Sequence, residues 1–528
     1  MTADTIYDDP ALSANGIYSW GRNRPERTAL INDATGETVN FGQLLARANS
    51  IANQIRALGL EEGDVVASWQ RNSIEQWEFF AGAMQLGLQL VPISTHLTDA
   101  EVEYILADSG ARLLVASSEL AERLSRTETI PADRRFAAGP EVAGWRPFTD
   151  LRDGGSADAP TDRVAGAFMY YTSGTTGRPK GVRRTLYRIT PEVYAAGSAA
   201  FLSRFGIEGD PGIALLFSPA YHAAPGTNMW IALSQGFTVV ILEKFDAEKV
   251  LRSIPKYGIS LMNSVPTQIH RMLALSEELR AGLDMSSLRN VLVAGAKFAP
   301  TLKTRALDYF GPVVWEYFAA TEGFVCAASP EEARERPGTV GRPDPESIRI
   351  LDEDGNEVAS GVTGTIHFRS LGGVFSYHND AEKTAKSVDA EGFINCGDLG
   401  YLDDDGYLYI QDRRVDLIIT GGVNVYPAEV EQRLAEHPAV ADVAVVGVPD
   451  EEWGHSVVAA VQLNPEYTPG EELADELRTF CRDALAGPKV PRTIVFESEL
   501  PRTPTGKMRR NLVRDELTNS LAARFASS

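Results

Sequence analysis

Residues 170–181 read YYTSGTTGRPKG, which places three glycines, three threonines, a serine and two cations behind a pair of tyrosines. Glycines let backbone N–H groups turn toward a ligand, and hydroxyls and a lysine add donors that suit phosphate oxygens. The preceding run VAGAFMYYT (164–172) predicts a short buried strand, and a strand followed by a glycine-rich turn is a usual platform for a nucleotide. The stretch therefore predicts an anion site, with a solvated surface loop as the alternative.

This loop is not the Walker loop of nucleoside triphosphatases. That motif has four residues between its glycines and Ser or Thr after its lysine. Here only Thr175 and Thr176 separate Gly174 from Gly177, and Gly181 follows Lys180.

Composition restricts the class of protein. A chain of 528 residues that is 44% hydrophobic can bury more than one core, so two or more domains are expected. A formal charge of −22 argues against a nucleic acid or an anionic membrane as partner. Cys326, Cys396 and Cys481 lie too far apart for a disulfide framework or a thiolate metal cluster, and no histidine precedes a glutamate as in the metalloprotease helix.

The N-terminal residues and the length of the apolar runs indicate the compartment in which the protein acts. The first twelve residues carry acids where a secretory signal needs cations, and no apolar run approaches the roughly 18 residues of a membrane span. We expect a cytoplasmic enzyme without integral membrane association.

Apolar periodicity predicts an α/β fold. Leu44, Ala48, Ile51, Ile55 and Leu58 fall on one helical face that ends at Gly59. Buried strands are predicted at 212–217, 237–242 and 290–294, separated by helical stretches, which is the pattern of parallel α/β layers.

The type of predicted secondary structure changes toward the C-terminus. From about residue 345 the sequence predicts antiparallel strands joined by Asp-Gly turns, and after QDRRVD (411–416) a compact α+β segment with a helix in 427–437. The expected organisation is a large N-terminal region of layered α/β subdomains with a small antiparallel β-rich part, residues 1–414, followed by a small α+β domain, residues 415–528.

Four further stretches complete a pattern with the loop. They are YFAATEG (317–323), NCGDLGYL (395–402), QDRRVD (411–416) and PRTPTGKMRR (501–510). Each has an ordinary explanation when taken alone, such as a solvated acid, a turn residue, a surface cation or a basic tail. Together and in this order they resemble the adenylate-forming superfamily of acyl-CoA synthetases, peptide-synthetase adenylation domains and firefly-type luciferases, over nearly the whole chain.

The resemblance implies an acid-thiol ligase that uses ATP, Mg²⁺ and coenzyme A. Such an enzyme joins a carboxylate to the α-phosphorus of ATP, releases pyrophosphate and passes the acyl group to a thiol. Because phosphoryl transfer is catalysed mainly by positioning and charge neutralisation, the site needs cations and a donor-rich loop.

The resemblance also implies roles for individual residues. It assigns catalysis to Lys507, Thr321 and Glu322, with Mg²⁺ held by Glu322 and Thr175. It assigns cofactor binding to Ser173, Gly174, Thr175, Thr176, Gly177, Lys180, Gly295, Ala296, Phe318, Asp398, Arg413, Gly421 and Gly422. Within this set, the loop holds pyrophosphate, Asp398 and Arg413 the ribose side, and Gly421 and Gly422 a pantetheine path, with a tight hairpin as the alternative for the last two. The C-terminal domain would swing after adenylation and withdraw Lys507.

Three positions depart from the family's pattern. Phe318 and Ala319 stand where Tyr and Gly are usual, so a phenyl face is expected to stack on adenine without a hydroxyl. Val415 stands at the usual hinge position, which leaves Arg414 or Asp416 as the pivot. Lys297 and Phe298 stand where the adenine wall usually carries Pro.

The substrate is predicted from SPAYHAAPGTNMW (218–230). This run contains no acid to pair an ammonium, which disfavours an amino-acid substrate. Small residues mixed with aromatics favour a bulky apolar acid, with ordinary core packing as the alternative. The predicted pocket residues are Tyr221, His222, Ala223, Ala224, Gly226, Met229 and Trp230.

Two alternatives to coenzyme A ligation stay open. The acyl group would pass instead to a carrier protein or an amine, or the chain would be a non-catalytic nucleotide-binding module. The presence of Glu322, Asp398 and Lys507 disfavours the module. A monomer and a homodimer are both compatible with the sequence.

Overall fold

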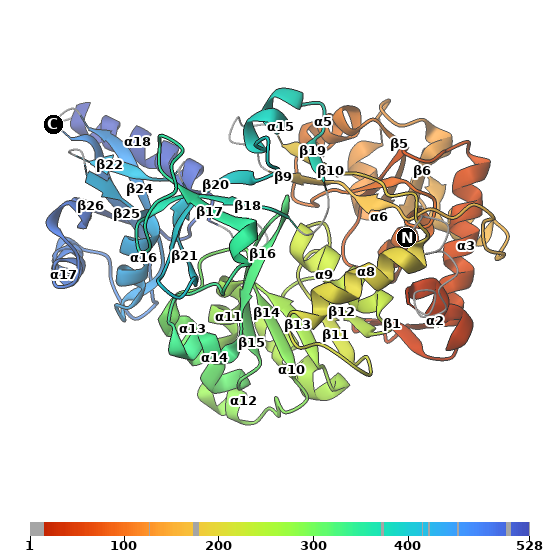
Figure 1. The fold of residues 1–528 in the computed structure, drawn as a ribbon, viewed down its shortest axis with the longest axis horizontal. Coiled ribbons are helices and arrows are strands. Elements are labelled where there is room, and N and C mark those ends of the chain that lie inside the picture. The colour runs from red at the N-terminus through yellow and green to blue at the C-terminus, as the bar shows by residue number, and fades with distance from the viewer. Residues whose placement is uncertain are drawn as a thin grey trace.

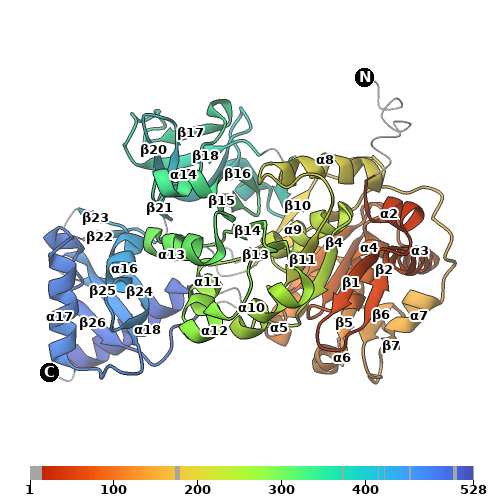
Figure 2. The ribbon, with the colours of Figure 1, turned by 90° about the horizontal axis from the view of Figure 1, so that it is seen from below.

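The computed structural model describes residues 15–125, 127–172, 179–370, 374–413, 416–420, 423–450, 453–502 and 508–526. Figures 1 and 2 show the elements from α16 onward gathered at the end of the molecule opposite the N-terminal helices α2 (Ile17–Asn23) and α3 (Phe41–Ala57). None of the described helices is both long enough and apolar enough to cross a membrane.

The N-terminal part contains a six-stranded, entirely parallel sheet. Its order is β7 (Arg146–Pro147), β6 (Arg135–Ala138), β5 (Ala111–Ser117), β3 (Val65–Trp69), β4 (Gln89–Pro92) and β8 (Ala167–Phe168). The helices of this part are α2, α3, α4 (Ile74–Ala83), α5 (Asp99–Ser109), α6 (Ser118–Ala121) and α7 (Phe148–Asp153). Helix α3 begins at a capping box formed by Asn40 and Gln43 and buries the predicted Leu44, Ala48, Ile51 and Ile55 face.

A second sheet of eight strands follows. Its order is β16 (Gly323–Ala328), β15 (Val314–Ala320), β14 (Asn290–Val293), β13 (Leu261–Ser264), β11 (Ile213–Leu216), β12 (Thr238–Ile241), β1 (Thr28–Asn32) and β2 (Thr38–Asn40). The inner strands run parallel, and only the edge strands β16 and β2 are antiparallel. The helices of this part are α8 (Pro191–Ser203), α9 (Ala223–Ser234), α10 (Ala247–Tyr257), α11 (Pro266–Leu273), α12 (Glu277–Ala281), α13 (Pro300–Phe310) and α14 (Pro330–Glu335).

Two small antiparallel sheets include the β-rich part predicted from about residue 345, and one of them also takes in β9 and β10 from residues 170–184. One has the order β19 (Phe375–Tyr377), β10 (Lys180–Arg184), β9 (Tyr170–Thr172), and the other β17 (Ile348–Leu351), β18 (Gly364–Phe368), β20 (Ile394–Leu402), β21 (Leu408–Arg413). Helix α15 (Ala381–Ser387) connects them. Gly406 has a φ of 83°, as the predicted Asp-Gly turn between β20 and β21 requires.

The C-terminal elements have a core of their own. They are the hairpin β22 (Ile418–Thr420) and β23 (Val423–Val425), the sheet β24 (Val440–Asp450), β25 (Gly454–Leu463), β26 (Thr493–Phe496), and helices α16 (Pro427–Ala435), α17 (Glu471–Arg482) and α18 (Arg510–Ala526). Buried apolar side chains such as Val430, Val445 and Leu477 cluster with each other. The predicted fold class is confirmed, while the boundary near residue 414 stays a prediction.

The run at 164–172 differs from the single strand that the sequence predicts. It splits into β8, which pairs with β4 in the six-stranded sheet, and β9, which pairs with β10 in the small sheet. The chain therefore passes from one sheet to another at Met169, immediately before the glycine-rich loop.

Candidate active site

One large cavity lies at the carboxyl edge of the eight-stranded sheet. Strands β15, β14, β13 and β11 are successive neighbours, and the segment that follows each strand contributes to the wall. These contributions include Ser218, Val265, Gly295 and Thr321. Ligands of open α/β sheets bind at this edge because the loops after parallel strands meet there. The cavity has a volume of about 2250 Å³ and also reaches residues of the C-terminal elements.

A buried carboxylate stands at the turn between β15 and β16. Glu322 is 7% exposed, and the hydroxyl of Tyr377 on β19 donates a hydrogen bond of 2.6 Å to Glu322 Oε1. Burial and the neighbouring carboxylate both raise the pKa of Tyr377, so its hydroxyl stays a donor at neutral pH. Among the described residues, no group of three or more His, Cys, Asp or Glu side chains is arranged to hold a metal ion by itself.

Two lysines lie near this carboxylate. Lys180 on β10 forms an ion pair with Asp380, which also caps α15 by accepting a 2.9 Å hydrogen bond from the backbone N–H of Lys383. The Lys383 ammonium lies 3.8 Å from the centre of the Tyr377 ring. Burial lowers the pKa of Lys383, against the attraction of Glu322. The other predicted loop residues, Ser173, Gly174, Thr175, Thr176 and Gly177, lie outside the described residues.

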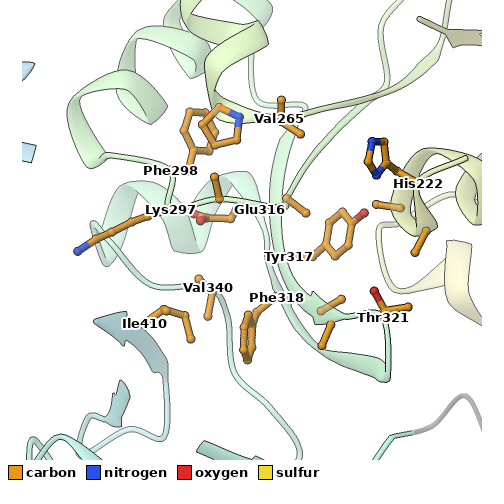
Figure 3. Close-up of a pocket in the computed structure, with 18 of the residues that line it drawn as sticks. His222, Val265, Lys297, Phe298, Glu316, Tyr317, Phe318, Thr321, Val340 and Ile410 are labelled. Atoms are coloured by element: carbon orange, nitrogen blue, oxygen red, sulfur yellow. The ribbon is translucent and has the colours of Figure 1, made fainter. Parts of the chain in front are cut away.

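The predicted nucleoside residues line the cavity as well. Gly295, Ala296, Phe318 and Asp398 all contribute to its wall. Asp398 is 6% exposed and lies in β20 opposite Arg413 of β21, so it is a buried strand residue and not the turn residue of the ordinary alternative. Figure 3 shows Phe318, Val340 and Ile410 gathered on one side, away from His222 and Thr321.

The adenine wall departs from the family's pattern for a structural reason. Phe298 is buried and forms part of the cavity wall, and the ammonium of Lys303 lies 5.9 Å from its ring centre. Lys303 in turn forms a buried ion pair with Glu316 and donates a 3.1 Å hydrogen bond to the carbonyl of Thr339. At the position that usually carries Pro, a buried phenyl ring therefore lies beside this ion pair.

Helix α9 divides the predicted acid-pocket residues between two faces. His222 at its N-cap and Ala223, Ala224, Thr227 and Ile231 line the cavity, which is the spacing of one helical face.

The remaining predicted positions lie elsewhere, and a role for them in binding the acid stays a prediction. Tyr221, Gly226, Met229 and Trp230 are not among the residues that line the cavity. Met229 and Trp230 pack in the core, and Gly226 lies so close to the main chain of Ala220 that a β-carbon would stand 2.3 Å from its carbonyl oxygen. Helical periodicity turns these α9 residues away from the cavity, which a run of residue types does not indicate.

The C-terminal elements close one side of the cavity. Lys507 lies outside the described residues, but Arg502 and Met508 on either side of that segment both line the cavity. Arg510 at the start of α18 is held by ion pairs of 3.1 Å to Asp416 and 2.6 Å to Glu431. The predicted pantetheine residues Gly421 and Gly422, the hinge candidate Arg414 and the neighbouring Val415 also lie outside the described residues, whereas the other hinge candidate, Asp416, is described.

Comparison with known families identifies this arrangement. The sequence model of the AMP-binding enzyme family matches residues 17–377, more than half of the chain, and that of the AMP-binding enzyme C-terminal domain matches residues 429–507. The chain belongs to the AMP-binding enzyme family. It is an adenylate-forming enzyme with an α/β fold, as the motif order predicts.

Relatives of this AMP-binding enzyme cover nearly its whole length. It is 32% identical to the fatty acid–[acyl-carrier-protein] ligase ScoC of Streptomyces coeruleorubidus, over 91% of this chain and 92% of that protein. It is also 32% identical to the long-chain-fatty-acid–CoA ligase FadD13 of Mycobacterium tuberculosis, over 93% and 96%. The crystal structure of the anthranilate CoA ligase AuaEII with anthranoyl-AMP superposes with a TM-score of 0.83 at 27% identity, covering 99% of this chain and 100% of that one.

Sequence reasoning missed several residues that line the cavity. They are Arg184, Tyr194, Tyr377 and Lys383, and Asp380 accepts a hydrogen bond from the backbone of Lys383. Arg184 has a local signal, because a second arginine follows PKGV at the end of the quoted loop. Tyr377 reaches Glu322 across 55 positions, and no local pattern indicates that contact.

Proposed function

We propose that this AMP-binding enzyme activates a bulky apolar carboxylic acid and transfers the acyl group to the thiol of coenzyme A. The observation that carries the proposal is the convergence of Thr321, Glu322, Gly295 and Asp398 on one cavity that also reaches the residues flanking Lys507. A nucleotide site and a catalytic lysine from separate parts of the chain would then serve one reaction.

The first step joins two anions. A carboxylate oxygen of the acid attacks the α-phosphorus of ATP, the bond to the β-phosphate oxygen breaks, and pyrophosphate leaves. In this proposal Thr321 donates to the α-phosphate and Lys507 bridges the carboxylate and that phosphate. Their charges and donors stabilise the transition state more than the separated reactants, which is the condition for catalysis.

Separate groups of residues hold the adenosine end and the phosphate end of the nucleotide. Asp398 accepts from the ribose hydroxyls, with Arg413 beside it, while Phe318 stacks on adenine against the backbone of Gly295 and Ala296. The loop residues Ser173 to Gly177 and Lys180 hold the pyrophosphate portion.

The donor set fits Mg²⁺, which takes one or two carboxylates together with substrate phosphates. Glu322 offers one buried carboxylate, and the described residues offer no larger cluster that would suit a metal held by protein alone. When bound, Mg²⁺ neutralises charge on the phosphate oxygens. Thr175 is the second residue proposed to support it.

The acid would lie along the cavity-facing side of α9. His222, Ala223, Ala224 and Ile231 leave room beside aromatic side chains such as Phe201 and Phe324. An apolar wall of this kind favours an aryl or alkyl acid over acetate.

The second step uses coenzyme A. The thiol sulfur attacks the acyl carbon, AMP leaves and the thiol proton is lost. Support for coenzyme A comes from the relative FadD13, a CoA ligase, while ScoC, a carrier-protein ligase, supports a carrier protein as the second candidate. In either case we propose that residues 415–528 form a domain that swings after adenylation and brings Gly421 and Gly422 beside the thiol arm.

The test is acid-dependent pyrophosphate release by the purified full chain with ATP and Mg²⁺ across fatty and aryl acids. Mass analysis of products formed with coenzyme A, a phosphopantetheinylated carrier protein or an amine then identifies the acceptor. Glu322→Gln should lose most of the release, whereas Glu382→Gln, which changes an exposed acid paired with Lys386, should not. Absence of acid-dependent release with every acid would refute the proposal.

A further inference from the structure

Arg184 is a half-buried cation with an unused donor. It ends strand β10 and lines the cavity, where its Nη2 donates a 2.6 Å hydrogen bond to the carbonyl oxygen of Thr321. Its Nη1 is buried and has no hydrogen-bond partner among the described residues. Burial lowers the pKa of Arg184, which is the sign of a charge removed from water without full compensation.

The wall formed by residues 165–231 supplies no carboxylate, and the carboxylate that attracts Arg184 is that of Glu322, the residue proposed to bind Mg²⁺. Of the described cavity-lining residues between positions 165 and 231, the charged ones are Arg184 and Arg204, and none is Asp or Glu. Arg204 lies 5.5 Å from the centre of the Phe324 ring and makes no ion pair within the described part of the chain. Because an uncompensated buried charge is costly, this wall favours a ligand that brings negative charge.

Two phenols accompany the guanidinium. Tyr187 and Tyr194 line the same cavity, and 46% and 38% of their respective surfaces stay accessible. Both influence the pKa of Arg184, so they lie close to it. Burial of its hydroxyl raises the pKa of Tyr194, which keeps that hydroxyl protonated and able to donate. A guanidinium with neighbouring hydroxyl donors matches the geometry of a carboxylate.

The phosphate end has its own cations at a different place. Lys180 and Arg184 begin and end β10, and four residues of strand separate their Cα atoms by about 13 Å. Lys180 pairs with Asp380 and lies near Lys383, whereas Arg184 lies near Tyr194 of helix α8 and is also attracted by Glu322. The two cations therefore have separate partners, and Arg184 forms no ion pair with a carboxylate of the described residues.

We propose that Arg184, with the hydroxyls of Tyr187 and Tyr194, binds a second carboxylate of the acid substrate, so that the enzyme prefers dicarboxylic acids with an apolar body. This inference rests on the proposed function and narrows its substrate class. The reacting carboxyl lies at Thr321, and the second one pairs with the unused Nη1.

The test compares each dicarboxylic acid with its own monomethyl ester. A series of benzene dicarboxylic acids and of aliphatic diacids of increasing length covers the unknown spacing, and kcat/KM for pyrophosphate release is measured for both members of each pair. At least one diacid should be preferred over its ester. Arg184→Gln should reduce that preference by about 10- to 100-fold, the range for losing a hydrogen bond to a charged group.

Two further variants separate recognition from folding. Arg184→Lys keeps the charge and should retain part of the preference. Arg183→Gln removes the neighbouring arginine, which donates to the carbonyl of Gly63 and does not line the cavity, and should leave the preference unchanged. Both members of a pair undergo the same adenylation step. A general loss of activity therefore cancels in the ratio of kcat/KM for the diacid to kcat/KM for its ester.

The results that would refute this inference differ from the result that would refute the proposed function. A preference that survives Arg184→Gln, or a KM for ATP that rises equally with both members of a pair, would overturn the inference and assign Arg184 to the nucleotide. Calorimetric binding of the same diacids without ATP gives a readout independent of catalysis. If no acid releases pyrophosphate, the proposed function fails, yet Arg184-dependent diacid binding would still support this inference and its absence would still refute it.

Discussion

The hydrogen bond between Tyr377 and Glu322 offers a sharp test of the metal site. Tyr377→Phe removes one hydroxyl and leaves the ring that packs beneath Lys383. The lost bond is short, at 2.6 Å, it is buried, and its acceptor is the carboxylate proposed to bind Mg²⁺.

The expected effect can be estimated from this geometry. Tyr377 orients Glu322 through Oε1, which leaves Oε2 for the metal. A partner that orients a metal ligand typically contributes 10- to 100-fold in metal affinity or activity, roughly 1.4 to 2.7 kcal/mol. That range agrees with about 1.5 to 3 kcal/mol for a hydrogen bond to a charged group. The Mg²⁺ concentration that gives half-maximal pyrophosphate release should therefore rise about tenfold or more, with little change in the KM for the acid.

The assay is a Mg²⁺ titration of pyrophosphate release at saturating ATP and acid. Tyr257→Phe is the matched control, because Tyr257 donates a 2.8 Å hydrogen bond to Asp33 away from the cavity. Unchanged Mg²⁺ dependence in a folded Tyr377→Phe protein would refute the reasoning, as would an equal change in Tyr257→Phe.

Three other changes test separate parts of the enzyme. Lys507→Ala should slow acyl-adenylate formation by about 100-fold and spare thioester formation from supplied acyl adenylate, and equal loss in both half reactions would argue against a domain swing. Asp398→Ala should raise the KM for ATP about tenfold or more with a smaller effect on kcat, and unchanged ATP kinetics would remove Asp398 from the ribose site. Lys303→Met should lower the free energy of unfolding by about 3 to 5 kcal/mol, because it leaves Glu316 charged and buried. Burial raises the pKa of Glu316 in the folded state, so this loss should shrink as pH falls and the carboxyl is protonated, as chemical denaturation at several pH values will show.

The layered α/β fold was predictable because its strands are continuous apolar runs. The predicted strands at 212–217, 237–242 and 290–294 appear as β11, β12 and β14, each shorter by one or two residues. The exchange of sheets at Met169 was not predictable. Both sheets accept an extended strand with apolar side chains. Which sheet each strand joins is decided by pairing strands that lie far away in the sequence.

The nucleotide side of the site was easier to predict than the acid side. Thr321, Glu322 and Asp398 belong to compact motifs, and all three line the cavity. The acid side depends on which face of a helix meets the cavity, and residue type did not distinguish Ala223 from Met229. Contacts between distant segments, such as that of Arg184 with the Thr321 carbonyl, leave no periodic trace in the sequence.

The two-faced character of α9 has a consequence for altering the enzyme. Ala223, Ala224, Thr227 and Ile231 face the cavity, while Met229 and Trp230 hold the helix in the core. A combinatorial library restricted to Ala223, Ala224 and Thr227 would sample new acid specificities without emptying the core, whereas Ile231 is buried in the core and should be kept. With the same number of changes at the buried positions, most variants would fail to fold. Substrate range in this enzyme is therefore open to change in small steps, through side chains that contribute little to its stability.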